Sequence, residues 1–410
     1  MSFGTALTGL KAAASDLDVS GNNVANSQTT GFKSSRTEFA DIFASSNLGV
    51  SQTAVGQGVR LANTRQQFSQ GQFDFTGRSL DLAVNGEGFF RVSDGGETQY
   101  TRNGAFSLDK DGYIVDANGR QLTGFQADGE GNITGAQGPL QVNIGNVAPQ
   151  ASNEMRLSAN LDATADALTN PFDSGDPETY NFSTSTTLYD SQGGDHLTTL
   201  YFRKTGSNQW NVQATVDGAS GVGSPGNEID MGTVSFDTQG QLTAPANDTL
   251  TSGAVPLSGN VADLDLSLNV EDLTQFGSPF EVKQLRQNGY AAGQFTGLGV
   301  EADGRIIARF TNGQTEALGQ VALARFPAPE QLQQVGDTSW VETFQSGTPV
   351  VAAPGSSGTG SLEPGALEQS NVDITEELVS MITAQRNYQA NSQMISTQNQ
   401  ITQEILNIRS

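Results

Sequence analysis

The distribution of proline constrains this chain more than any other feature of its sequence. All 13 prolines lie between Pro139 and Pro364, so both ends lack the residue that breaks helices. Near the N-terminus, apolar and small residues recur at alternating steps of four and three, the spacing of one helix face. The pattern predicts a helix over residues 3–26. The residues of this stripe are Phe3, Leu7, Leu10, Ala14, Leu17, Gly21 and Val24.

The other end carries a second helical pattern, over residues 374–408. Asp373 followed by Glu376 resembles a capping box, in which a side chain before the helix accepts hydrogen bonds from the first free amides. Gln385 and Ser392 interrupt the stripe, and after residue 395 it shifts to a neighbouring helix face. Its apolar residues are Ile374, Leu378, Met381, Tyr388, Ile395, Ile401, Ile405 and Ile408.

Neither predicted helix is flanked by further helical segments that could complete a bundle, and isolated helices of this kind are marginally stable in water. Packing inside one domain is the common explanation for such stripes. Two other arrangements remain open: the ends cover each other, or they cover copies of themselves in neighbouring subunits. We expect contacts between subunits to contribute, so the two stripes form a candidate assembly interface.

The residues between the ends are predicted to form β-structure. Asn-Gly and Asp-Gly dipeptides recur about every ten residues from Asn85-Gly86 to Asp128-Gly129, and alternating stretches such as 80–84 separate them. The rhythm resumes after residue 305 and is typical of a sandwich or barrel. We therefore expect a mainly β protein of several domains, with α-helices only at its two ends.

Composition and proline positions suggest the domain boundaries. The two ends, 1–30 and 366–410, are expected to pair as one helical domain. The polar residues 31–70 are interpreted as an extended connector. Residues 71–145 and 285–345 are expected to form one β-domain, and 146–284, bracketed by Pro149 and Pro279, an inserted second one. Residues 346–365 include 12 Gly, Ser or Pro in 20, which predicts an extended linker.

The charge of the chain is strongly negative and unevenly distributed. The formal net charge is −24, and residues 150–280 hold three basic and 17 acidic side chains. Nucleic acid would repel such a surface, so a nucleic-acid partner is excluded. No apolar run approaches the roughly 18 residues that a membrane span requires, so we expect no membrane insertion. An acidic middle between near-neutral ends suggests a solvated body with ends reserved for contacts.

Residues that could support catalysis or metal binding are scarce. The chain has no cysteine, and its one histidine, His196, is expected to be a solvated loop residue beside Asp195. Residues 109–112 (Asp-Lys-Asp-Gly) faintly resemble a calcium loop but lack its third carboxylate and closing Glu, so a hairpin turn explains them better. We expect no catalytic residue, no cofactor and no metal site. The N-terminus lacks a basic segment followed by an apolar one, so a cleaved secretion signal is not expected.

Two motifs go beyond composition. Residues 17–33 resemble the N-terminal motif of the bacterial flagellar rod and hook axial proteins. Residues 368–373, 377–379 and 384–391 resemble the C-terminal motif of that family. Residues 82–90 resemble the strand that opens the inner β-domain of that family, and the matches cover about half of the chain. Gly21 is a mild departure, because the family often carries a larger residue there. The motif residues are Asn22, Asn23, Ala25, Asn26, Thr30, Gly31, Phe32, Gln385, Arg386, Asn387 and Tyr388.

Within that family, the large insertion at 146–284 and the Tyr-Thr-Arg-Asn-Gly stretch at 100–104 are similar to hook subunits. The resemblance implies a nested architecture, with paired terminal helices lining a tube, an inner β-domain around them and the inserted β-domain outermost. It also implies export through the flagellar type III apparatus and an extracellular location in the flagellum. The expected partners are copies of the chain itself, the rod, the hook cap and the hook–filament junction proteins. The finished tube would bend while it transmits torque from rod to filament.

Two alternatives remain. A distal rod subunit would share the motifs, although the large insertion argues against it. A secreted acidic β-rich adhesin or enzyme would share the composition, but it would not need two proline-free helical ends. Electron microscopy of concentrated protein separates these classes, because only an axial protein should form tubes.

Overall fold

The chain folds as two units in a computed structural model that describes residues 3–42, 56–129, 131–142, 145–219 and 228–408. Unit 1 comprises Met1–Ile144, Gly297–Arg309 and Thr315–Ser410. Unit 2 comprises Gly145–Thr296 and Phe310–Gln314. Most of unit 2 is therefore one long insertion into the chain of unit 1.

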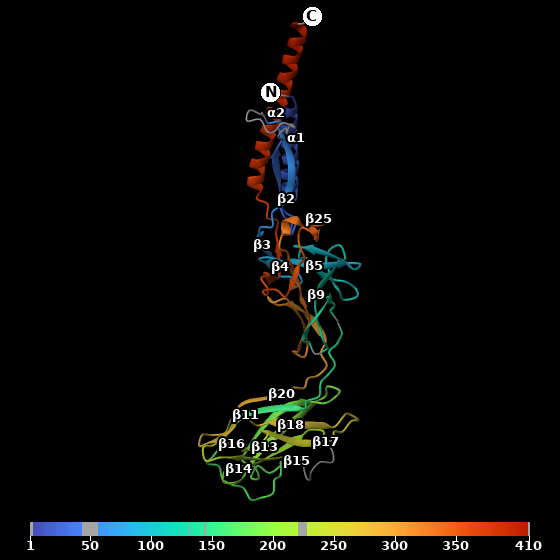
Figure 1. The fold of residues 1–410 in the computed structure, drawn as a ribbon. Helices are drawn as coiled ribbons and strands as arrows, with labels where there is room; N and C mark the ends of the chain where they lie inside the picture. The colour runs from blue at the N-terminus through green and yellow to red at the C-terminus, as the bar shows by residue number, and fades with distance from the viewer. Residues whose placement is uncertain (1–2, 43–55, 130, 143–144, 220–227, 409–410) are drawn as a thin grey trace. The chain divides into compact units, whose positions relative to one another are not determined.

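The two ends of the chain are α-helices that lie side by side in unit 1 (Figure 1). Helix α1 spans Phe3–Ala25 and helix α2 spans Ile374–Ile408. They are antiparallel, because Gly9 lies against Asn391 while Asn23 bonds to Glu377. Asp373 caps α2: its Oδ1 accepts hydrogen bonds from the amides of Thr375 (2.8 Å) and Glu376 (3.2 Å). The expected class, mainly β with paired terminal helices, is confirmed.

A two-stranded antiparallel sheet covers part of α1. Strand β1 spans Ser35–Asp41 and strand β2 spans Val59–Gln66. The Thr37 hydroxyl donates to Asp16 Oδ1 of α1 at 2.5 Å. The polar stretch predicted to be an extended connector thus includes a regular strand pair, which its weak alternation did not reveal. Residues 43–55 of that stretch lie outside the described residues.

The β-region of unit 1 contains a 13-stranded sheet and two small strand pairs, β3 with β29 and β4 with β28. A cluster that includes Phe90, Leu122 and Leu323 forms its core, and an aromatic cluster around Trp340 lies beside it. The 3-10 helix η1 spans Pro329–Gln331. The strands are β3 Phe73–Phe75, β4 Leu82–Asn85, β5 Phe89–Asp94, β6 Glu97–Thr101, β7 Ser107–Leu108, β8 Ile114–Val115, β9 Gln121–Ala127, β10 Ile133–Pro139, β21 Phe295–Val300, β22 Arg305–Phe310, β23 Thr315–Val321, β24 Leu323–Arg325, β25 Gln333–Gly336, β26 Ser339–Val341, β27 Val350–Ala352, β28 Ser361–Pro364 and β29 Ala366–Glu368.

The segment 346–365, expected to be an extended linker, is tied into unit 1 by strands instead. Strand β27 pairs with β24, and β28 pairs with β4. Leu362 is 1% exposed and belongs to the main core of unit 1. The composition of segment 346–365 suggested a flexible linker, but pairing with free strand edges and burial of a few apolar side chains hold the segment in place.

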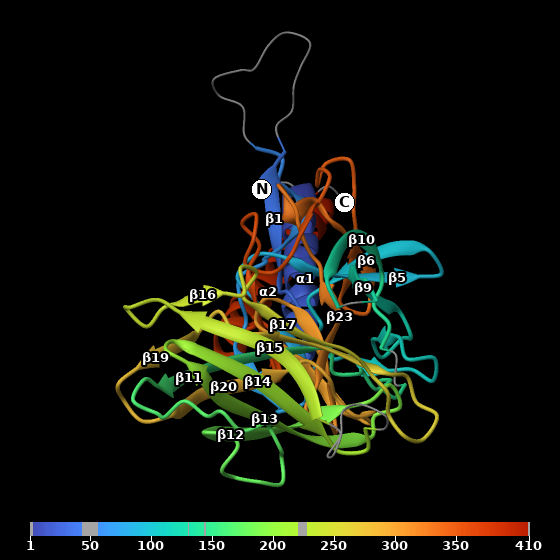
Figure 2. The same ribbon diagram turned by 90° about the horizontal axis from the view of Figure 1, so that it is seen from below.

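Unit 2 is a sandwich of two five-stranded sheets, and Figure 2 looks onto the sheet β12–β13–β14–β15–β16. The other sheet has the order β17–β18–β11–β19, with β20 also paired to β11. Strand β20 crosses residue 284, so the expected outer boundary of the insertion falls inside a strand. The bounds are β11 Glu154–Asp162, β12 Phe182–Tyr189, β13 Asp195–Gly206, β14 Gln209–Val216, β15 Glu228–Phe236, β16 Leu242–Ala244, β17 Thr249–Val255, β18 Leu264–Asn269, β19 Leu273–Phe276 and β20 Glu281–Gln287.

Strict alternation explains how the sandwich of unit 2 forms. Strand β14 buries every second residue, from Trp210 to Val216, because successive side chains of a strand point to opposite faces. Inward residues of both sheets join in one core cluster of 24 buried residues, which include Leu157 of β11 and Phe202 of β13. Two sheets that bury one face each and expose the other are stable together.

Candidate assembly interface and motif junction

Helices α1 and α2 meet through small side chains. The buried residues of α1 are Ala6, Ala13, Ser20 and Asn23, and the first three recur every seven residues. A side chain added at Gly9 would place its Cβ only 2.6 Å from the Asn391 Oδ1 atom of α2. The two backbones therefore approach closely along this line. The contact within one chain is not the apolar stripe that the spacing had singled out.

The apolar stripe of α1 lies beside this contact and stays open to solvent. Phe3 is 50% exposed and Leu7 is also exposed, while the rest of the stripe is half-buried: Leu10, Ala14, Leu17, Gly21 and Val24. Exposed apolar side chains of this size in a row mark a contact surface that one chain leaves unfilled.

The stripe of α2 is more open still. Its exposed residues include Leu378 at 47%, together with Ile374, Tyr388 and Ile401, while Met381 and Ile395 are half-buried. Val379 and Ile382, which the stripe omitted, are exposed as well. The side chains of Ile405 and Ile408 lie outside the described residues. Among the described residues of α2, only Ala384 is buried.

A groove of about 370 Å³ joins the two stripes near the start of α1. Phe3 of α1 lines it together with Met394 and Ile401 of α2. Phe3 and Ile401, predicted from separate ends of the sequence to belong to one interface, therefore share one surface.

Three segments that are distant in the sequence meet at a buried ion cluster in unit 1. Glu368 precedes α2, Lys33 ends the N-terminal motif and Arg102 lies in the Tyr-Thr-Arg-Asn-Gly stretch. Lys33 Nζ lies 2.6 Å from Glu368 Oε1, and Arg102 Nη1 lies 3.1 Å from Glu368 Oε2. The side chains of Lys33 and Glu368 are fully buried. This cluster, Lys33–Glu368–Arg102, is called the motif junction below.

Backbone contacts complete the motif junction. Lys33 Nζ also donates to the Ser69 carbonyl at 2.7 Å, and the Gly31 amide donates to the Glu368 carbonyl at 2.8 Å. Gly31 has a φ of +71°, and an added Cβ would lie 2.5 Å from the Asn103 amide nitrogen. Only glycine fits this close approach, which explains the glycine of the N-terminal motif.

Burial sets the electrostatics of the motif junction. Desolvation lowers the pKa of Lys33 from its usual 10.5, while the carboxylate of Glu368 opposes the change. Burial likewise lowers the pKa of Arg102, again opposed by Glu368. Lys33 and Arg102 share the Glu368 carboxylate here, so removing Glu368 would leave both cations buried without the carboxylate that contacts them directly.

The remaining motif residues divide into a structural set and an exposed set. Asn23 is 1% exposed, and its side-chain amide donates to the Ser35 carbonyl at 2.8 Å and to Glu377 Oε1 at 2.7 Å. It thereby ties α1 to β1 and to α2. Phe32 is also buried, and Asn26 and Thr30 are half-buried, whereas Asn22 and Ala25 are exposed. The C-terminal motif residues, Gln385, Arg386, Asn387 and Tyr388, are all exposed on α2.

The motif junction was not predicted, although all three of its charged residues lie in stretches that resemble the family. Nothing in the local sequence around these charges marks them as partners, since Lys33, for example, lies close to Arg36 and Glu38. Sequence spacing could not bring residues 33, 102 and 368 together.

The single histidine is not the solvated loop residue that was expected. His196 lies on β13 with a side chain that is 14% exposed. Its Nε2 is 3.2 Å from Asp190 Oδ2, and its Nδ1 is 2.6 Å from the Asp217 carbonyl oxygen. These bonds fasten two loops of unit 2. Asp190 itself has a lowered pKa: burial acts to raise it, but hydrogen bonds from Gly194, His196 and Gln192 outweigh that effect.

The described residues contain no group of three or more His, Cys, Asp or Glu side chains that could hold a metal ion. Asp109, from the sequence that resembles a calcium loop, accepts amide hydrogen bonds from Asp111 (2.9 Å) and Tyr113 (2.7 Å), as a hairpin turn requires. Neither helix of the described chain is long and apolar enough to cross a membrane.

Comparison with known proteins places these features in a family. Four family models match: flagella basal body rod protein at residues 3–33, flagellar hook protein FlgE/F/G D1 domain at 83–159, flagellar basal body protein FlaE D2 domain at 160–290, and flagellar basal body rod FlgEFG protein C-terminal at 363–408. The flagellar hook protein FlgE of Salmonella typhimurium is 38% identical over 414 residues, covering 100% of both chains. The chain belongs to the flagellar hook protein FlgE family.

Other FlgE proteins are similar in sequence to this chain over nearly their whole length. FlgE of Escherichia coli is 38% identical and covered completely, and FlgE of Borreliella burgdorferi is 30% identical over 98% of each chain. The crystal structure of Helicobacter pylori FlgE2 aligns with a TM-score of 0.51 at 14% identity, over 73% of this chain and 100% of that one. This last likeness concerns the fold alone.

Proposed function

We propose that this chain is the structural subunit of a flagellar hook, which assembles with copies of itself into a flexible, curved tube. The carrying observation is the contrast within unit 1: α1 and α2 pair through small residues while their large apolar residues remain exposed. Such a surface gains free energy only when another molecule covers it, at about 25 cal/mol per Å² of apolar area. In a protein of this family, copies of the same chain are the natural partner.

The proposal assigns the stripes of α1 and α2 to the inner wall of the tube. The motif junction then holds the helices at a fixed place against the β-region of unit 1, because it links the segments directly next to α1 and α2. A tube built this way transmits torque from the rod to the filament through its helices. Unit 2 forms the outer part, whose contacts change as the tube bends.

Several partners follow from a hook location. The tube is extracellular and belongs to the flagellum, and its ends contact the rod and the hook–filament junction proteins. A hook cap covers the growing end, and the flagellar type III apparatus exports the subunits. The role is structural, and the proposal includes no catalytic activity.

The chain is 30–38% identical to hook proteins over 98–100% of its length, which favours this proposal over a distal rod subunit, a secreted adhesin or an enzyme. Electron microscopy of the purified chain at high concentration tests it. The account predicts tubes that curve. Straight rods would support the distal rod alternative, and the absence of any polymer at high concentration would contradict self-assembly.

A further inference from the structure

Unit 2 has few Lys and Arg side chains, and two of them donate hydrogen bonds to backbone carbonyls within the unit. Its residues include five Lys or Arg and 18 Asp or Glu. Lys204 Nζ donates to the carbonyls of Ala163 (2.7 Å) and Ala165 (2.9 Å), and Arg203 donates to the carbonyls of Leu168 and Asn170. These two hold the chain that follows β11.

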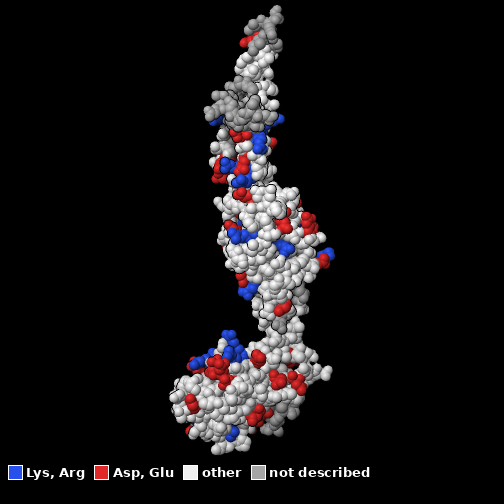
Figure 3. Space-filling model, in the orientation of Figure 1, with Lys and Arg blue, Asp and Glu red and all other residues white. Residues whose placement is uncertain are grey.

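The other three cations, Arg156, Lys283 and Arg286, form what we call the basic face. Arg156 on β11 lies directly opposite Arg286 on β20. Both alternate with residues of the core, so they point to the outer side of their sheet, and Lys283 on β20 is exposed too. In Figure 3, a group of Lys and Arg side chains lies on one part of the surface of unit 2, among Asp and Glu.

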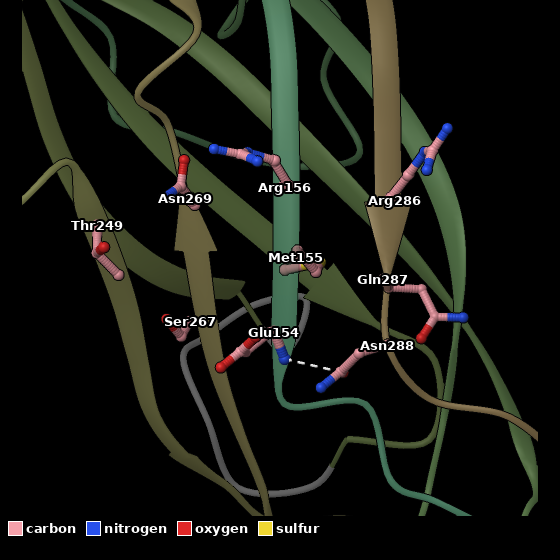
Figure 4. Close-up of a pocket in the computed structure, with 9 residues that line it drawn as sticks. All are labelled: Glu154, Met155, Arg156, Thr249, Ser267, Asn269, Arg286, Gln287 and Asn288. Atoms are coloured by element: carbon pink, nitrogen blue, oxygen red, sulfur yellow. Dashed lines mark hydrogen bonds between the residues drawn. The ribbon is translucent and has the colours of Figure 1, made fainter. Parts of the chain in front are cut away.

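The arginines of the basic face do not converge on one small ligand. Their side chains point away from each other in Figure 4, as like charges on opposite strands should. Arg156 forms ion pairs with two carboxylates: its Nη2 lies 3.0 Å from Glu271 Oε2, and its Nε lies 3.8 Å from Asp272 Oδ2. Lys283 and Arg286 have no carboxylate partner among the described residues. A groove of about 470 Å³ is lined by Arg156 and Arg286 together with Glu154, Ser267, Asn269 and Asn288. Glu154, Glu271 and Asp272 share this face, so the basic face offers two unpaired cations, Lys283 and Arg286, to an acidic partner.

The other side of the sandwich carries an acidic segment. The segment between β11 and β12 lies over the outer side of β13, where Phe172 and Tyr180 pack on Tyr201 at ring distances of 5.1 and 4.8 Å. Tyr201 points outward, because its neighbours Leu200 and Phe202 belong to the core. The segment Asp173–Glu178, called the acidic loop here, holds three carboxylates, and the Ser174 amide bonds to Glu228 Oε1 at 2.6 Å. The basic face and the acidic loop therefore lie on opposite sides of unit 2.

We propose that the basic face of one copy docks on the acidic loop of unit 2 in the next copy. This inference rests on the proposed self-assembly. Complementary surfaces on opposite sides of one body make a head-to-tail contact, which continues from copy to copy, whereas a self-complementary surface would close a pair. The charges are exposed, so each ion pair is weak and salt screens it. Such a contact orders the outer units without preventing them from shifting as the tube bends.

Carbodiimide cross-linking of assembled tubes tests the contact directly. The reagent activates a carboxyl group, and a lysine amine in contact with it forms an amide bond. Tubes assembled from equal parts of isotope-labelled and unlabelled chain should yield mixed-label peptides that join Lys283 to Asp173, Asp176 or Glu178. High salt during cross-linking should reduce their yield. Tubes in which Lys283 joins only carboxylates of unit 1, or none, would overturn the docking while leaving self-assembly intact.

Charge exchange provides the second test. Lys283→Glu with Arg286→Glu should raise the critical concentration for assembly about two- to fivefold, since exposed ion pairs are individually weak. Adding Asp176→Lys and Glu178→Lys to the same chain should restore it to within about twofold of the unchanged protein. Lys110→Glu, at an exposed turn of unit 1, serves as the control and should change nothing. A fourfold variant that assembles no better than the double variant would refute the pairing. Failure of the unchanged chain to assemble would refute the proposed function itself.

Discussion

The terminal helices expose several large apolar residues, whereas unit 2 buries most of its own. Unit 2 buries 24 residues in one core that both of its sheets share. Among described residues, α1 and α2 bury only three apolar side chains, all of them alanines, and expose residues as large as Phe3 and Leu378. A region that completes its own core is stable alone. A region that leaves large apolar residues uncovered depends on a partner, so cohesion of the polymer is assigned to the helices.

Removing both helices is the strongest way to break this comparison. A chain limited to residues 27–372 keeps every strand and the motif junction. We expect a folded, soluble monomer that forms no tubes at any concentration. Sedimentation and circular dichroism would check this result. The shorter chain 71–360 is the informative contrast: it lacks β28 and β29, which pair with β4 and β3, and should lose β-structure. Tubes formed by the 27–372 chain would place cohesion in the β units instead.

A single charge in the stripe of α1 should have a nearly equal effect. Leu17 is half-buried in one chain, and the account places it inside the polymer. Leu17→Asp would bury an unpaired carboxylate on assembly, at a cost of several kcal/mol per contact, and should abolish tubes. Circular dichroism of the monomer should be unchanged. Asp18→Asn at the exposed neighbouring position is the control and should assemble normally. Normal tubes from Leu17→Asp would remove the stripe from the interface.

The motif junction should matter for folding stability rather than for contacts between copies. Glu368→Ala leaves Lys33 and Arg102 buried without the carboxylate that they share, so we expect a loss of about 3–5 kcal/mol in the free energy of unfolding. Glu301→Ala removes an ion pair of similar length, 2.9 Å to Arg305, but at an exposed site, and should cost about 0–1 kcal/mol. Urea denaturation measures both. Equal losses would show that burial of the junction contributes nothing.

The pKa of Lys33 gives this comparison a pH dependence. The folded pKa lies below 10.5, so between the two values the unfolded chain binds more protons than the folded one. The contribution of Lys33 to stability therefore rises with pH until 10.5 is passed. Lys33→Met should flatten this rise in denaturation measured between neutral pH and pH 10, and an unchanged slope would contradict the lowered pKa.

Replacing unit 2 should have the smallest effect on cohesion and a visible one on shape. With residues 149–284 exchanged for a short flexible linker, we expect tubes of normal yield that are straight, because outer contacts bias curvature without holding subunits together. The structure favours a cut after residue 287 instead of 284, since β20 extends to Gln287. Microscopy of isolated hooks and basal bodies decides the outcome. Curved tubes would exclude unit 2 as the source of bending, and missing tubes would make it essential.

The two helices and the mainly β fold could be predicted from the sequence because both depend on local patterns. The spacing of Phe3 to Val24 and the cap at Asp373 are properties of neighbouring residues. The sequence pattern did not predict the contact through Ala6, Gly9 and Ala13, because the more prominent periodic pattern in that helix is its stripe of large apolar residues. The strands within 346–365 depend on free edges supplied by β4 and β24, which are distant in sequence. The motif junction depends on tertiary approach in the same way.

Thiol labelling of assembled tubes tests the central claim most directly, because the chain has no cysteine of its own. Leu378→Cys places a single thiol in the exposed stripe of α2, and Ser207→Cys places one in an exposed turn of unit 2 as the control. The account predicts that both thiols react in the monomer, and that in tubes the thiol at 378 is protected while the thiol at 207 still reacts. Equal reactivity at residue 378 in monomer and tube would contradict the assignment of cohesion to the helices.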